Sequence, residues 1–179
     1  MKVLCSHAVD IHAPADAVFA HVCDLAHWPT WFGCVVSAAQ PSGGALGVGE
    51  NVHLCLHAGR RRWQEDFEVT RYITNAFLSL EAFYSAARRI DFRFERRGSL
   101  TRLWCAIGYP VYGGMVPAAL DAAVGRRGVK RGLRDSLVHL KNLLEERAGA
   151  TLTEDLDQLA VAPIATPASQ PPPRPVRVG

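Results

Sequence analysis

The segment from residue 3 to residue 32 constrains the fold more than any other part of the chain. Residues 3–11 alternate in a way that predicts a β-strand. A short helix is expected next, with Pro14 in its first turn, where a missing N–H breaks no hydrogen bond. Asp24 is suited to cap a second short helix, and Trp28 and Trp31 are expected to break the helical pattern. The chain therefore begins with a strand that leads directly into two short helices.

Turn residues divide the middle of the chain into short alternating segments, which predict strands. We expect strands at 35–39, 51–57, 61–73, 77–84, 89–95 and 100–109. The loops between them are short, which favours antiparallel neighbours, because parallel pairing needs long crossovers. Since each strand alternates, one face of the sheet should be buried and the other hydrated.

Residues 117–147 change to a helical period. The apolar stripe of this predicted helix consists of Val129, Leu133, Leu137, Leu140 and Leu144. A helix of this length is long for a small domain, and we expect its glycines to bend it or to split its first third, at Gly125, Gly128 and Gly132. Gly149 is expected to end the helix.

Six of the eleven prolines follow Ala150. This composition predicts one folded domain over residues 1–148 and a disordered, proline-rich tail over 149–179. The tail contains a PxxP pattern that is typical of ligands for protein modules, but an unstructured spacer is the simpler interpretation. A protein partner for the tail is therefore an open alternative.

Charge and composition exclude several classes of protein. The formal net charge of +3 and the pI near 8.7 are too mild for the dense basic face of a nucleic-acid binder. We expect no membrane-spanning segment and no secretory signal, because no apolar run is long enough. The five cysteines show no CxxC spacing and are expected to be reduced thiols of a cytoplasmic protein.

The strand at 51–57 carries polar residues on one face, which invites a metal interpretation. Alternate residues on a strand lie about 7 Å apart, so three in a row cannot share one ion without distortion. The opposite face is the better core face, and we expect the polar residues to face solvent and to bind no metal. The polar face consists of Asn51, His53, Cys55 and His57, and the core face of Val52, Leu54 and Leu56.

The order strand, two short helices, six strands and long helix resembles the START-related helix-grip (SRPBCC) superfamily, and specifically its polyketide cyclase/dehydrase and lipid-transport branch. The resemblance covers about 145 residues and is more specific for fold than for activity. The residues that carry it are Ile11, Ala13, Pro14, Val18, Phe19, Asp24, Trp28, Pro29, Trp31, Gly47, Gly49, Val69, Gly98, Thr101, Leu137, Leu140, Lys141 and Glu145.

The resemblance implies an α+β helix-grip fold, in which a curved antiparallel sheet of about seven strands and the long C-terminal helix enclose an apolar cavity. Such a cavity binds hydrophobic molecules through its apolar surface, and a few polar groups orient the ligand. The alternative is that the same side chains fill a solid core. The candidate lining residues are Val9, Trp63, Phe67, Ile90, Phe92, Phe94, Leu103, Ile107, Val129, Leu133 and Leu137.

Three polar residues are candidates for acid–base chemistry. By strand alternation, Glu65 shares the apolar face of Trp63 and Phe67, where a carboxylate is suited to acid–base chemistry. The alternatives are a rim position, since a bulge would invert the parity, or an ion pair with an arginine such as Arg93. His7 lies on an apolar strand face, where a satisfied core histidine is the commoner role. Tyr109 is expected near the start of the long helix, as a ligand contact or a packing aromatic.

These features predict a protein that binds a hydrophobic small molecule, such as a lipid, a polyketide or an isoprenoid-like compound, as a carrier or sensor. An enzyme of the cyclase/aromatase type, with Glu65, His7 or Tyr109 moving protons, is the alternative. A third possibility is an interaction protein that recruits a partner through its tail. No cofactor is expected.

Overall fold

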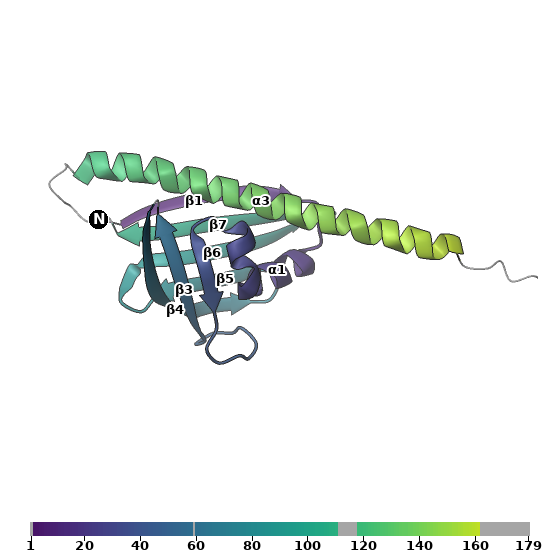
Figure 1. The fold of residues 1–179 in the computed structure, drawn as a ribbon, viewed down its shortest axis with the longest axis horizontal. Helices are drawn as coiled ribbons and strands as arrows, with labels where there is room; N and C mark the ends of the chain where they lie inside the picture. The colour runs from purple at the N-terminus through teal and green to yellow at the C-terminus, as the bar shows by residue number, and fades with distance from the viewer. Residues whose placement is uncertain (1, 59, 111–117, 162–179) are drawn as a thin grey trace, which may run out of the picture.

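A computed structural model describes residues 2–58, 60–110 and 118–161 of the protein. Its strands form one antiparallel sheet in the order β1-β7-β6-β5-β4-β3-β2, so that the first and last strands of the chain are neighbours (Figure 1). The strands are β1 (Lys2–Ile11), β2 (Val35–Ala39), β3 (Asn51–Ala58), β4 (Arg61–Ile73), β5 (Phe77–Ala82), β6 (Ser85–Arg97) and β7 (Leu100–Pro110). The predicted α+β class and the curved antiparallel sheet of seven strands are confirmed.

The helices between β1 and β2 form a compact corner. α1 (Ala15–Cys23) is followed by a 3-10 turn, η1 (Leu25–His27), and by the single helical turn α2 (Trp28–Trp31). Asp24 caps η1 by accepting a hydrogen bond from the backbone N–H of Ala26, at 3.1 Å. The tryptophans therefore form a helical turn of their own, whereas we expected them to break the pattern; Pro29 fits there because it lies in the first turn.

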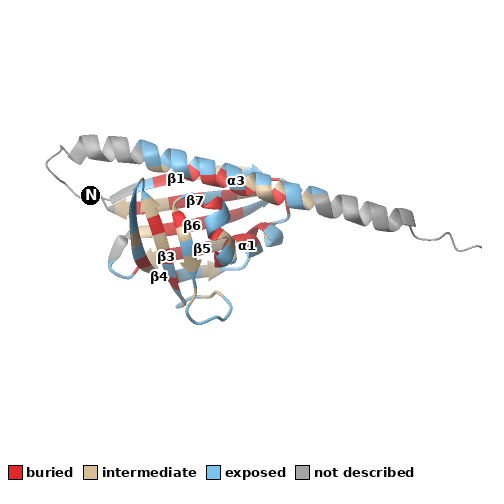
Figure 2. Cartoon of the chain, in the orientation of Figure 1, coloured by how far each residue is buried: buried red, intermediate tan, exposed pale blue. Residues whose placement is uncertain are grey.

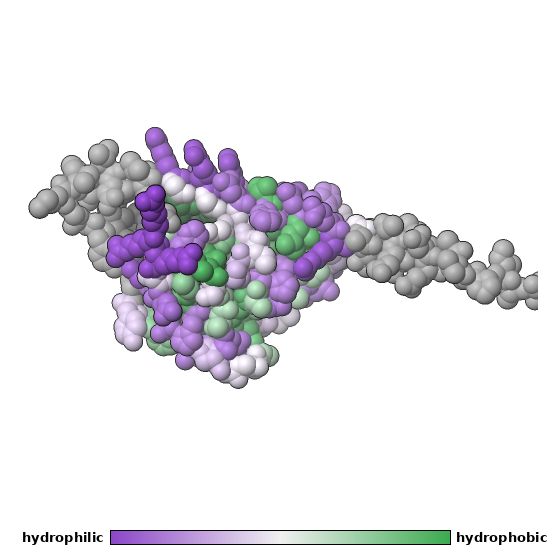
Figure 3. Space-filling model, in the orientation of Figure 1, coloured by the Kyte–Doolittle hydropathy of each residue, from purple (hydrophilic) through white to green (hydrophobic). Residues whose placement is uncertain are grey.

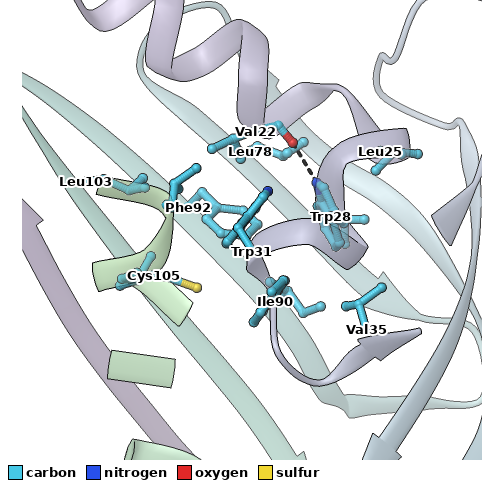
Figure 4. Close-up of a cluster of buried hydrophobic side chains, with 14 of the residues drawn as sticks. Val22, Leu25, Trp28, Trp31, Val35, Leu78, Ile90, Phe92, Leu103 and Cys105 are labelled. Atoms are coloured by element: carbon cyan, nitrogen blue, oxygen red, sulfur yellow. Dashed lines mark hydrogen bonds between the residues drawn. The ribbon is translucent and has the colours of Figure 1, made fainter. Parts of the chain in front are cut away.

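The aromatic corner, defined as Trp28, Trp31 and Phe32, is fully buried against the inner face of the sheet (Figure 4). Trp31 stacks on Phe32, and all three rings contact Phe92 of β6 edge to face. The Trp28 indole donates a hydrogen bond of 2.7 Å to the backbone carbonyl of Val22, which ties the corner to α1. This cluster fills the middle of the interior.

The long helix α3 (Ala118–Val161) packs across the open side of the sheet (Figures 1 and 2). Its buried stripe consists of Leu133, Leu137, Leu140 and Leu144. Polar bonds fix its position at the edge of β1: Lys141 donates to the carbonyl of Asp10, and the backbone N–H of His12 donates to Glu145, both at 2.7 Å.

α3 differs from the prediction in two respects. It is not split at Gly125, Gly128 or Gly132, because the surrounding turns maintain its hydrogen-bond ladder; of the two effects expected of these glycines, bending stays a prediction. It also continues twelve residues beyond Gly149, since neither glycine nor proline interrupts residues 150–161 and the prolines begin only at Pro163. The predicted tail therefore begins as helix, and its remainder, residues 162–179, lies outside the described residues.

His21 lies at the junction of α1 and α3. Its ring packs edge to face on His27, with centroids 4.8 Å apart, and its Nδ1 atom lies 3.5 Å from Arg147 of α3. Burial, together with the positive charges of His27 and Arg147, lowers the pKa of His21 from 6.5 to about 4 against the opposing effect of Asp24.

Replacing Trp28 with alanine should lower the free energy of unfolding by about 3–5 kcal/mol, because a fully buried indole and its hydrogen bond are lost. Urea denaturation measures the change. Trp104→Ala is the matched control, since Trp104 lies on the outer face of the sheet and is 47% exposed. Equal losses for the two variants would contradict the central role of the aromatic corner.

The depressed pKa of His21 should make stability depend on pH. As the pH is lowered from 6.5 to about 4, His21 becomes protonated in the unfolded chain but stays neutral in the folded protein. The free energy of unfolding should therefore decrease as the pH falls through this window, and it should not depend on His21 above pH 6.5. His21→Gln should flatten the dependence in urea denaturation series, whereas His139→Gln, at an exposed position of α3, should not. An unchanged slope in His21→Gln would refute the assignment.

Candidate functional site

A cavity lies between α3, the inner face of the sheet and the segment that follows the aromatic corner. It consists of two adjoining compartments, which we call the helix compartment, of about 650 Å³, and the sheet compartment, of about 330 Å³. Figure 3 shows apolar surface in the recess beneath the helix, whose outer side is mainly hydrophilic. The residues common to both compartments are Phe32, Cys34, His57, Ala58, Ile107 and Val129.

Two features of the fold leave this volume open. Register shifts in the β2–β3, β4–β5 and β5–β6 pairs indicate bulges, which bend the sheet. Gly128 and Gly132 of α3 line the helix compartment, and a Cβ atom at either position would meet no atom within 4 Å. The absence of side chains at these two positions therefore leaves space between the helix and the sheet.

The predicted lining residues separate into two groups. Those that lie at the cavity wall are Trp63, Phe67, Ile90, Ile107, Val129 and Leu133. Those that the structure places in the packed core, away from both compartments, are Val9, Phe92, Phe94, Leu103 and Leu137. The side chains of the second group do not reach the cavity, because the aromatic corner and the leucines at the C-terminal end of the buried stripe fill the part of the interior that these side chains face.

Glu65 lies at the wall of the sheet compartment on the same face as Trp63 and Phe67. Its side chain is only 6% exposed, and its carboxylate accepts hydrogen bonds from the guanidinium of Arg88, at 2.5 Å, and from the indole of Trp63, at 3.3 Å. The arginine partner is Arg88 of β6 and not Arg93, because Arg88 shares the inner face with Ile90, whereas Arg93 lies one residue out of phase.

Of the other acid–base candidates, Tyr109 lies at the sheet compartment together with Glu65, and its hydroxyl is 3.8 Å from the Cys5 sulfur. His7 lies opposite Cys105 on the inner face of the β1–β7 pair and lines neither compartment. The structure therefore brings Glu65 and Tyr109 to one compartment and leaves His7 outside it.

The residues at the cavity that were not among the predicted site residues include Arg88, Cys34 and His57. His57 was expected to face solvent, but it is half-buried and lines both compartments, because the segment before β2 runs beside the end of β3. There the ring Nε2 of His57 lies 2.7 Å from the carbonyl of Gly33, and its backbone N–H donates to the carbonyl of Cys34. No local pattern signals this, since the pairing joins segments over twenty residues apart.

Cys34 contributes an apolar surface and not a nucleophile. Burial raises the pKa of its thiol to about 11, so the reactive thiolate is scarce at neutral pH. Of the other residues on the polar face of β3, Asn51 and His53 are exposed, as predicted, whereas Cys55 is half-buried. Within residues 2–58, 60–110 and 118–161 no group of His, Cys, Asp or Glu side chains has the arrangement of a metal site.

Comparisons with solved structures support this architecture. The Zhui aromatase/cyclase from Streptomyces sp. R1128 superposes with a TM-score of 0.65 at 14% identity, over 83% of this chain and 96% of that one. The di-domain aromatase/cyclase StfQ of the steffimycin biosynthetic pathway gives 0.65 at 13% identity, over 83% and 52% of the two chains. The protein TTHA0849 from Thermus thermophilus gives 0.63 at 17% identity, over 83% and 99%. At such identities the likeness concerns the fold alone.

Of the two comparisons made at the level of sequence, one finds a matching family and the other finds no matching protein. The search of curated proteins finds no match. In the described part of the chain, no helix combines the length and apolarity that crossing a membrane requires. The model of one family, described as polyketide cyclase / dehydrase and lipid transport, matches residues 3–145, which include every element that surrounds the cavity except the end of α3. The chain is therefore a member of the polyketide cyclase/dehydrase and lipid transport family, within the SRPBCC superfamily.

Proposed function

We propose that this protein binds a hydrophobic small molecule, such as a lipid, polyketide or isoprenoid-like compound, in the two-compartment cavity and acts as a carrier or sensor. The observation that carries the proposal is the open, mainly apolar volume beneath α3, with the buried Glu65–Arg88 ion pair at its wall. Sites of this composition bind through apolar contact and use their few polar groups to orient the ligand.

Apolar burial supplies the driving force for such binding. A ligand that hides about 300 Å² of apolar surface gains roughly 7 kcal/mol at about 25 cal/mol per Å², before the cost of association is subtracted. The aromatic walls contributed by Phe32, Trp63 and Phe67 add edge and face contacts to flat ligands. The location that we propose is the cytoplasm, because the five cysteines are present as thiols and not as disulfides, as in a reducing compartment.

Filling the cavity should abolish binding. Val129→Trp places an indole where the two compartments meet, so we expect native mass spectrometry of freshly purified protein to show an apolar adduct in the parent protein and none in this variant. Val138→Trp is the matched control, since Val138 lies on the same helix and is 43% exposed. A parent protein without adduct that also binds no added apolar dye would refute the proposed function.

A second candidate function is an enzyme of the cyclase/aromatase type. The observation that favours it is the presence of Glu65 and Tyr109 at the same compartment, where a carboxylate and a phenol are suited to proton transfer during ring closure and loss of water. Two of the similar structures are aromatase/cyclases by name. His7 takes no part in this version, because it lines neither compartment.

Tyr109→Phe tests the enzymatic alternative, because it removes one hydroxyl and leaves the shape of the compartment. If the protein closes rings in a reactive poly-β-ketone probe, the variant should lower the rate of cyclised product formation by about 100-fold, as measured by liquid chromatography and mass spectrometry. Tyr84→Phe is the control, since Tyr84 is 91% exposed and lines neither compartment. Equal rates with Tyr109→Phe, Tyr84→Phe and no protein would exclude catalysis by Tyr109.

A further inference from the structure

We propose that the Glu65–Arg88 pair selects ligands whose polar end is an uncharged hydroxyl group, an alcohol or a phenol, and rejects carboxylates. This inference rests on the proposed binding function, because it specifies the chemistry of the ligand that enters the sheet compartment.

The pair lies where the ligand's polar end must be accommodated. Glu65 is the most deeply buried charged group at the cavity wall, and Arg88 is about one-third exposed. Much of the remaining wall of the sheet compartment is apolar and aromatic, with Phe32, Trp63 and Phe67 among its residues. A polar ligand group that enters this compartment loses water and has to replace it with contacts to the polar groups of the wall, of which the Glu65 carboxylate is the most deeply buried.

The described charges of the sheet compartment cancel. Glu65 neutralises Arg88, and the remaining charged residue at the wall, Arg89, is bonded to Asp91 at 2.6 Å. A carboxylate ligand would bring a second negative charge next to Glu65 without a cation to offset it among these residues. Burying an uncompensated charge is costly, so acids are disfavoured, whereas a neutral ligand avoids this cost.

A hydroxyl group matches the hydrogen-bonding capacity of Glu65. An ionised carboxylate only accepts hydrogen bonds, and each of its oxygens has room for two. Its Oε2 atom has one long bond, of 3.3 Å, to the indole of Trp63. An alcohol or phenol can donate to this oxygen, whereas an ether, a ketone or a carboxylate cannot. The geometry thus favours hydroxylated ligands over equally apolar ligands that lack a donor.

Three probes with the same ring system separate these contributions: 2-naphthol, 2-methoxynaphthalene and 2-naphthoate. Isothermal titration calorimetry at neutral pH measures their affinities for the full chain. We expect 2-naphthol to bind best, the methoxy compound to bind several-fold more weakly for want of a donor, and the naphthoate to bind at least about tenfold more weakly.

Glu65→Gln tests whether the carboxylate is responsible. The variant keeps the size of the side chain but removes the negative charge beside Arg88, so the preference should reverse and the naphthoate should bind more tightly than 2-naphthol. Glu68→Gln is the matched control, because it removes the same charge from the opposite face of β4 and should keep the parent order. Thermal unfolding shows that each variant is folded; if Glu65→Gln is not, Glu65→Met replaces it, with the same expected reversal.

Each result decides the inference. The parent order together with its reversal in Glu65→Gln supports it. The inference is overturned if 2-naphthoate and 2-naphthol bind the parent protein with equal affinity, or if the order of affinities is unchanged in folded Glu65→Gln. Either result leaves the proposed cavity binding intact. If none of the three probes binds the parent protein, and native mass spectrometry shows no apolar adduct in either the parent protein or Val129→Trp, the proposed function fails and this inference fails with it.

Discussion

The packing of the aromatic corner against Phe92 decides how the interior of this protein is divided. The cluster of Trp28, Trp31 and Phe32 fills the concave side of the sheet at its centre, and the Trp28 indole anchors it to α1 through the carbonyl of Val22. Because the corner occupies one half of the space beneath α3, only the other half stays open as a cavity. The position of the site therefore follows from where the large side chains pack.

The cavity combines an apolar wall with a single deeply buried carboxylate. Glu65 is tolerated there because Arg88 and the Trp63 indole satisfy it, and a charge without such partners would be too costly to bury. The selectivity that we propose follows from the same arrangement. The ion pair can accept a hydrogen bond from a ligand hydroxyl group, but it has no net positive charge to offset a ligand carboxylate. The contact that satisfies the buried carboxylate is therefore also the contact on which the proposed selectivity depends.

Much of the fold was predictable from local patterns. Alternation placed Glu65 on the face of Trp63 and Phe67 correctly, since strand parity depends only on the backbone. Helical spacing identified the stripe from Leu133 to Leu144, although the helix runs on to Val161 and is not broken at its glycines. Local pattern did not distinguish Phe92 and Leu103, which fill the core, from Phe67 and Ile90, which line the cavity, because all four are apolar residues on the same face.

The sequence by itself determined the class of fold, the antiparallel pairing of consecutive strands from β2 to β7 and the main buried face of β3 and β4, because these depend on short-range periodicity and on loop length. Tertiary structure decided the pairing of Glu65 with Arg88, the presence of His57 and Cys34 at the cavity and the exclusion of His7 from it. These contacts join residues that are distant in the chain, and they depend on how side chains of different size share a single interior volume.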